Sequence, residues 1–152
     1  MIPVVSAPRL PPMSAEAVEK VRRLEEVTGR CPQVQVDTQH LLHAGVYART
    51  IRLPAGVVLT GVLIKVATVV IVSGRCTVFV GDEAVELSGY NVLPGGAGRK
   101  QVFLTHTDTD LTMLFPTDAQ SVDQAEAEFT DETDSLMSRQ HTDQNQILIT
   151  GE

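Results

Sequence analysis

The amino-acid sequence predicts a mainly β fold, a single antiparallel jelly roll of about eight strands, with a helix before it and a short helix after it. Between residues 45 and 116, short β-branched runs alternate with Gly, Pro and Asp at spacings of about 8–12 residues. The flanking segments show helical periodicity instead. A chain of 152 residues can build one domain with its own core.

Composition places the chain among ordinary globular proteins, with 43% hydrophobic and 20% charged residues. No window approaches the roughly 20 apolar residues of a membrane span, and no basic stretch followed by an apolar one begins the chain. We therefore expect no membrane partner and no secretory signal. Cys31 and Cys76 have no CxxC spacing, which favours free thiols in a reducing compartment over a disulfide between them.

Charge is distributed unevenly along the chain. Residues 1–116 carry 11 Lys and Arg against 10 Asp and Glu, whereas residues 117–152 carry one Arg against 9 Asp and Glu. Nucleic-acid phosphates would repel such an acidic tail, so no nucleic-acid partner is expected. The tail is predicted to be solvated or to dock on a basic surface of a neighbouring subunit.

The first segment, residues 1–13, is predicted to be an extended arm. Its four prolines remove backbone donors and fix φ, which excludes a helix or a central strand. Because the arm is apolar, we expect it to lie on its own domain or on a neighbour. Its predicted interaction residues are Ile2, Val4, Val5 and Leu10.

The second segment, residues 14–44, begins with a predicted helix over about 15–28. Ser14 is the expected N-cap, and Gly29 is expected to end the helix in a left-handed conformation. One apolar stripe recurs at helical spacing: Val18, Val21, Leu24 and Val27. A short strand around Val34 and Val36 follows. His40 and His43 are interpreted as surface or loop histidines, because no second ligand pair accompanies them.

The third segment, residues 45–116, holds the β domain. Tyr47–Leu53 alternates in polarity, and two near-continuous apolar runs suggest strands buried on both faces. Pro94-Gly95-Gly96-Ala97-Gly98 is predicted to be the most flexible loop. The remaining strands are expected at 57–63, 66–72, 76–80, 84–87, 91–93, 101–106 and 111–115, with 76–80 and 84–87 forming a hairpin.

The fourth segment, residues 117–152, is predicted to be an acidic helix and a tail. Thr117-Asp118 with Gln120–Ser121 resembles a capping box, and Val122, Ala125 and Phe129 mark the apolar side of a short helix. The terminal apolar tetrad 147–150 cannot be stable alone. We expect it to add to a sheet edge, in the same chain or on another protomer. Its interaction residues would be Ile147, Leu148 and Ile149.

The glycine and proline spacing of the β domain matches the cupin motifs: a PAG turn, Gly74 about 18 residues later, and a G-x4-P-x-G stretch ending at Gly96. Metal-binding cupins carry His and Glu ligands in these motifs. Here the first-motif positions are Gly61, Leu63 and Ala67, or Val62, Ile64 and Thr68, and Arg99 stands where the second motif has His. The sequence therefore predicts no metal and no cofactor.

Catalytic residues are not predicted either. Tyr47, Tyr90, His106, Arg99 and Lys100 are present, but their spacing does not pair an acid with a base. His106 is interpreted as a structural histidine on a strand. Arg99 and Lys100 are instead predicted to contact a partner from the loop that precedes them. The protein is expected not to be an enzyme.

Three segments, 49–65, 87–100 and 105–117, resemble a family of small cupin-like proteins found in tailed-bacteriophage genomes. The resemblance implies a phage product without metal ligands. We expect a non-enzymatic virion structural protein, either capsid decoration (cement) or a tail or collar component. It would be present in the host cytoplasm during assembly and would contact itself, as a dimer or trimer, and other phage structural proteins. The alternative is a metal-free cupin binding module or enzyme acting on a small or sugar ligand in the host.

Overall fold

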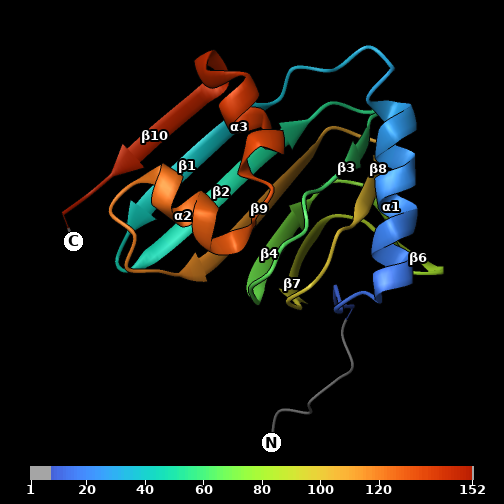
Figure 1. Ribbon diagram of the computed structural model, residues 1–152, viewed down its shortest axis with the longest axis horizontal. Coiled ribbons are helices and arrows are strands. Elements are labelled where there is room, and N and C mark those ends of the chain that lie inside the picture. Colours follow the sequence, from blue (N-terminus) through green and yellow to red (C-terminus); the bar gives the residue numbers. More distant parts are fainter. Residues whose placement is uncertain (1–7, 152) are drawn as a thin grey trace, which may run out of the picture.

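The computed structural model describes residues 8–151, which form ten strands in two sheets (Figure 1). The first sheet contains, in spatial order, β10 (Asn145–Ile149), β1 (Asp37–His43), β2 (Val46–Leu53), β9 (Thr109–Pro116), β4 (Thr68–Ser73) and β7 (Tyr90–Gly95). The second contains β3 (Val58–Thr60), β8 (Val102–Thr105), β5 (Cys76–Val80) and β6 (Glu83–Leu87). The predicted jelly roll, with its β5–β6 hairpin, is confirmed.

Helix α1 (Ala15–Thr28) matches its predicted bounds, and the Ser14 hydroxyl accepts a hydrogen bond from the Ala17 N–H. The left-handed ending predicted at Gly29 is wrong: its φ is −63°, and its N–H still donates to the Glu25 carbonyl as in a helix. Of the predicted apolar stripe only Val21 is buried, whereas Leu24 and Val27 are exposed. No helix among residues 8–151 is long and apolar enough to cross a membrane.

Two further helices follow the last antiparallel strand: α2 (Val122–Phe129) and α3 (Met137–Gln140). Helix α2 was predicted, but its cap is Ser121, whose hydroxyl accepts from the Gln124 N–H. The capping box expected at Thr117 is therefore shifted along the chain. Single 3-10 turns at Thr133–Ser135 and Thr142–Gln144 flank α3.

The first sheet extends beyond the second, and this difference divides the core into two clusters. Figure 1 shows α2 and α3 over β1, β2 and β9, while α1 lies at the other end beside β3 and β8. The intersheet cluster includes Val70, Val78, Phe103 and Leu111. The helix-covered cluster includes Tyr47, Met113, Phe115 and Phe129. Leu111 of the first cluster and Met113 of the second are two positions apart on the buried face of β9, so this strand connects the two clusters.

The two apolar runs expected to be buried on both faces are not. Strand β4 alternates, with Val70 and Val72 buried and Val69 exposed, because the outer face of the first sheet is uncovered. Only Val58–Thr60 of the earlier run is a strand. The residues after it cross over the barrel, where Ile64 bridges to Arg99.

Strand β1 places the two histidines on a sheet, so their interpretation as surface or loop residues is wrong for His40. Its ring is 3% exposed, with Nδ1 2.7 Å from the Tyr47 hydroxyl and Nε2 2.8 Å from Asn145 Oδ1. His43 lies on the opposite face, near the Thr150 hydroxyl. The terminal strand β10 pairs with β1 in parallel, which confirms the predicted edge addition within the same chain.

The glycine-rich segment after β7 is held by the N-terminal arm and is not the open loop that the sequence suggested. Pro94 and Gly95 belong to β7, and Leu10 bridges to Gly95. A Cβ atom on Gly96 would lie 2.4 Å from Cδ of Pro12, so only glycine permits this contact. Leu10 is buried in the intersheet cluster, so it packs on its own domain. Ile2, Val4 and Val5 lie outside the described residues.

Candidate functional site

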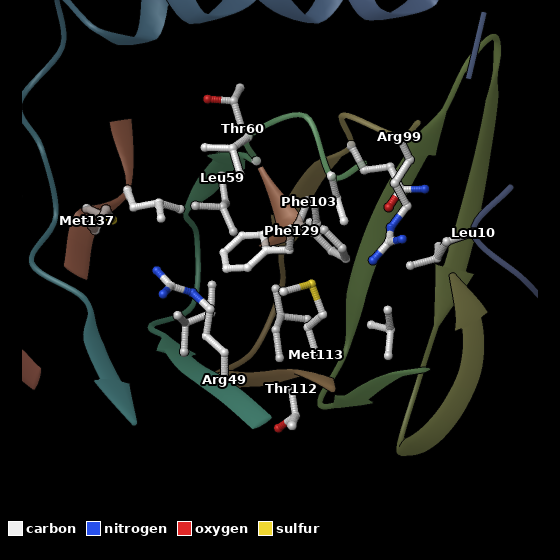
Figure 2. A pocket seen from close by; sticks show the side chains of 18 of the residues that line it. Leu10, Arg49, Leu59, Thr60, Arg99, Phe103, Thr112, Met113, Phe129 and Met137 are labelled. Carbon is white, nitrogen blue, oxygen red and sulfur yellow. The ribbon is translucent and has the colours of Figure 1, made fainter. Parts of the chain in front are cut away.

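A cavity of about 150 Å³ lies where the two core clusters meet. Its walls come from both sheets, from the crossing segment 60–64, and from the start of α3. Most of the lining is aliphatic, aromatic or thioether, and the polar groups are few. Figure 2 shows Phe103, Met113 and Phe129 around its centre, with the guanidinium groups of Arg49 and Arg99 on opposite sides in this view.

Arg99 is fixed by short contacts with the glycine segment of β7. Its Nη1 donates to the Gly96 carbonyl at 2.8 Å, and its Nη2 donates to the Thr68 hydroxyl at 2.6 Å. A Cβ atom on Gly95 would lie 2.7 Å from Cζ of Arg99, so Gly95 leaves the space that the guanidinium occupies. A residue with a side chain at position 95 would therefore displace the guanidinium of Arg99.

The charge of Arg99 has no acidic partner within the described chain. The side chain is 2% exposed, and none of the ion pairs formed by residues 8–151 includes it. Burial lowers the pKa of Arg99 to about 10, so the group is still charged at neutral pH. Buried charges are ordinarily paired, because desolvation costs several kcal/mol per ion.

Gln101, two residues after Arg99, also lines the cavity. It is 4% exposed, and its side-chain nitrogen is buried without a hydrogen-bond partner in the described structure. Leaving a buried amide donor unsatisfied costs about 1–3 kcal/mol. Arg99 and Gln101 therefore give the cavity lining a charge without a counter-charge and an amide donor without an acceptor in the described chain.

Arg49 at the other end is paired with a buried carboxylate. Its Nη1 donates to Glu126 at 2.8 Å, its Nη2 donates to the Ser138 hydroxyl at 3.1 Å, and its guanidinium lies over the Phe129 ring. Glu126 also accepts from Ser138 and Arg139. This network ties β2 to α2 and α3, so its role is to hold the helices on the sheet.

Four of the seven positions aligned with cupin metal ligands reach the cavity. Gly61, Val62, Ile64 and Arg99 line it, and Thr68 accepts a hydrogen bond from Arg99. Two aligned positions thus bond to each other with side chains that do not ligate metals. Residues 8–151 contain no group of three or more His, Cys, Asp or Glu that could hold a metal ion.

The other residues considered for catalysis lie apart from this cavity. Tyr47 is buried beneath α2, where burial raises its pKa to about 12. His106 lies just after β8, not on a strand, and its Nε2 is 2.7 Å from the Thr77 hydroxyl. The titratable side chains among the described lining residues are Arg49 and Arg99, and neither can serve as a general base at neutral pH.

The loop contact predicted for Arg99 and Lys100 is made inside the chain, because the arm and α1 cover that loop. Lys100 is 1% exposed, and its Nζ lies 2.9 Å from Glu25 of α1 and 3.4 Å from Glu132. Glu132 also pairs with Arg22. This part of the acidic tail therefore docks on basic residues of its own chain, and burial of Lys100 could not be predicted from its position before a strand.

The predicted interaction residues of β10 remain on the surface. Ile147, Leu148 and Ile149 are 56%, 60% and 49% exposed, although their backbone pairs with β1. The sequence signal was correct about their location at a sheet edge. Sequence reasoning missed Gln101 and Arg49 as cavity residues. A single polar residue in a strand pattern does not show whether its side chain has a partner inside the protein.

No protein-family model and no curated protein matches the sequence. Among solved structures, a cupin superfamily protein from Desulfitobacterium hafniense superposes with a TM-score of 0.48 and 15% identity over 59% of this chain and 84% of that one. An RmlC-like cupin family protein from Methanocaldococcus jannaschii gives 0.46 and 13%, over 58% and 84%. Salicylate 1,2-dioxygenase from Pseudoaminobacter salicylatoxidans gives 0.46 and 17%, over 75% and 33%. The jelly-roll fold of this chain is established by its own strand pairing.

Proposed function

We propose that this protein is a small-molecule-binding barrel that uses neither a metal nor a catalytic acid–base pair. The observation that supports the proposal is the cavity at the junction of the two clusters: it is mostly apolar and has a few polar groups at its ends. Ligand sites in proteins usually have this composition. A packed jelly roll with only a structural role would be expected to fill such a space with side chains.

Fluorobenzene is the probe for this proposal, because an apolar cavity of comparable size binds benzene. We expect a titration followed by methyl NMR to shift the signals of Val70, Leu111 and Met113, which line the cavity. The methyl signals of Val58, which is exposed on the second sheet, serve as the internal control. Lining signals that do not move at the solubility limit of the probe would contradict a ligand-binding barrel.

A second proposed function, assembly, is favoured by the outer face of the first sheet. The register aligns one apolar row across all six strands: Leu148, Leu41, Ala48, Leu114, Val69 and Pro94. The adjacent row, Gln146, Gln39, Thr50, Thr112, Ile71 and Val92, is also uncharged. With strands about 4.8 Å apart, each row spans roughly 24 Å, which is comparable to the width of a standard interface.

We propose a second copy of this chain as the occupant, because the two uncharged rows can pack on the same rows of a copy without placing like charges opposite each other. The edge strand β10 lacks the charged residues that usually protect sheet edges. The virion as the site of this assembly rests on the resemblance to phage proteins. Mass spectrometry of purified phage particles would test the virion location, and the expected result is the presence of this protein at a fixed copy ratio.

Leu148→Lys is expected to convert a self-associated form into a monomer in light scattering coupled to size-exclusion chromatography. Leu148 is 60% exposed, so the substitution places a charge on the proposed interface at little cost to folding. Val58→Lys is the matched control, since Val58 is 45% exposed on the other sheet. A wild-type protein that is monomeric, or two variants with equal effects, would refute assembly through this face.

A further inference from the structure

We propose that the cavity binds the carboxylate of a small apolar acid, with Arg99 and Gln101 holding the carboxylate and the apolar walls holding the body of the ligand. This inference rests on the proposed binding function and specifies its ligand class. Two observations carry it: Arg99 is a buried cation without an acidic partner in the described chain, and Gln101 is a buried amide donor without an acceptor. Both residues line the same cavity, two positions apart in the chain.

The donor inventory of Arg99 and Gln101 fits an anion. A guanidinium has five N–H donors, and only two hydrogen bonds from Arg99 to the protein are formed, to Gly96 and Thr68. The Gln101 amide adds two N–H donors that have no acceptor. A carboxylate offers two oxygens with about four acceptor sites and one negative charge, so it satisfies both residues and neutralises one cation.

The rest of the lining is mostly apolar, which disfavours more highly charged ligands. Val70, Phe103, Leu111 and Met113 line the same cavity, and they provide no donors for the outer oxygens of a phosphate dianion. A sugar would leave most of its hydroxyl groups without partners against these walls, which is costly. One charge at one end and an apolar body at the other therefore describe the ligand class.

The volume sets the size of that body. A dry cavity of 150 Å³ binds benzene in an engineered protein, and the cavity here is about 150 Å³. A body of about six carbons is therefore accommodated, as in benzoate or a short branched acid. Arg49 is the less suitable anchor, because Glu126 already neutralises it at 2.8 Å.

The test measures binding of 4-fluorobenzoate and of fluorobenzene by fluorine NMR at neutral pH, with the full chain. Wild type is expected to bind the carboxylate more tightly than the neutral probe. Arg99→Met should weaken 4-fluorobenzoate binding by about 10- to 100-fold, the range for a lost charged hydrogen bond. Binding of fluorobenzene should be unchanged. Arg75→Met, at an exposed arginine, is the control and should change neither affinity.

Two results would overturn the inference in different ways. If fluorobenzene binds but 4-fluorobenzoate binds no better, or if Arg99→Met weakens both probes equally, the carboxylate assignment is wrong and the binding barrel remains. If neither probe binds to protein whose circular dichroism is native, the proposed binding function is itself wrong. Gln101→Leu provides a second variant should Arg99→Met fail to fold, with an expected loss of roughly 3- to 10-fold for the carboxylate alone.

Discussion

Replacing Glu126 with alanine is expected to lower the free energy of unfolding by about 3–5 kcal/mol, the cost of removing one partner from a buried ion pair. Glu126 is 1% exposed on the inner side of α2. It accepts from Arg49 at 2.8 Å, from Ser138 at 2.5 Å and from Arg139 at 2.9 Å. Without it, Arg49 would be a second buried cation lacking a counter-charge.

Urea denaturation followed by circular dichroism measures this loss. Asp123→Ala on the same helix is the matched control, because Asp123 is exposed and its carboxylate lies as far as 3.9 Å from Arg139. Such a surface pair contributes about 1 kcal/mol or less. Equal losses for the two variants would mean that the network does not hold α2 and α3 on the sheet.

The pH dependence of the same comparison has a defined sign. Burial alone would raise the pKa of Glu126, but hydrogen bonds from Ser138 and Arg139 and the charge of Arg49 outweigh it, and the pKa lies below its ordinary value. The stabilisation is therefore fully present above the unfolded pKa of about 4.3. It is lost as the pH falls through the folded pKa. The advantage of wild type over Glu126→Gln should shrink in the same acidic window.

Leu10→Ala is expected to destabilise the domain by about 2–5 kcal/mol, the usual cost of a large-to-small core substitution. Leu10 is 1% exposed and lies in the intersheet cluster. Its backbone bonds to Pro94 and Gly96, at 2.9 and 2.7 Å, do not depend on the side chain. The loss therefore reports packing of the arm on its own domain.

Leu24→Ala is the control for this measurement, since Leu24 is 37% exposed on α1, and surface substitutions usually change stability by less than about 0.5 kcal/mol. If Leu10→Ala were as mild as Leu24→Ala, residues 8–13 would not be part of the folded core. Deletion of residues 1–13 removes the Leu10 side chain too, so it is expected to unfold or weaken the domain along with any effect on assembly.

Local patterns in the sequence were sufficient to predict those helices and strands that are determined by residues close together in the chain. The helix over 15–28, the jelly roll and the pairing of the last tetrad at a sheet edge are confirmed. Each follows from periodicity or from turn residues within a short window. The cupin spacing gave two alternative registers plus Arg99. Of these seven positions, Gly61, Val62, Ile64 and Arg99 line one cavity, whereas Leu63, Ala67 and Thr68 do not.

Burial and partners were decided only by tertiary structure. Arg49 and Glu126 are 77 positions apart, and Arg22 and Glu132 are 110 positions apart, yet each pair is in contact. The sequence is equally consistent with an acidic tail that is solvated and with one that docks on its own chain. The number of charges in a segment does not show which residues lie close together. Likewise, Arg99 follows a glycine-rich stretch that is typical of exposed loops. It is buried because Gly95 leaves space for its guanidinium and the arm covers the loop from outside.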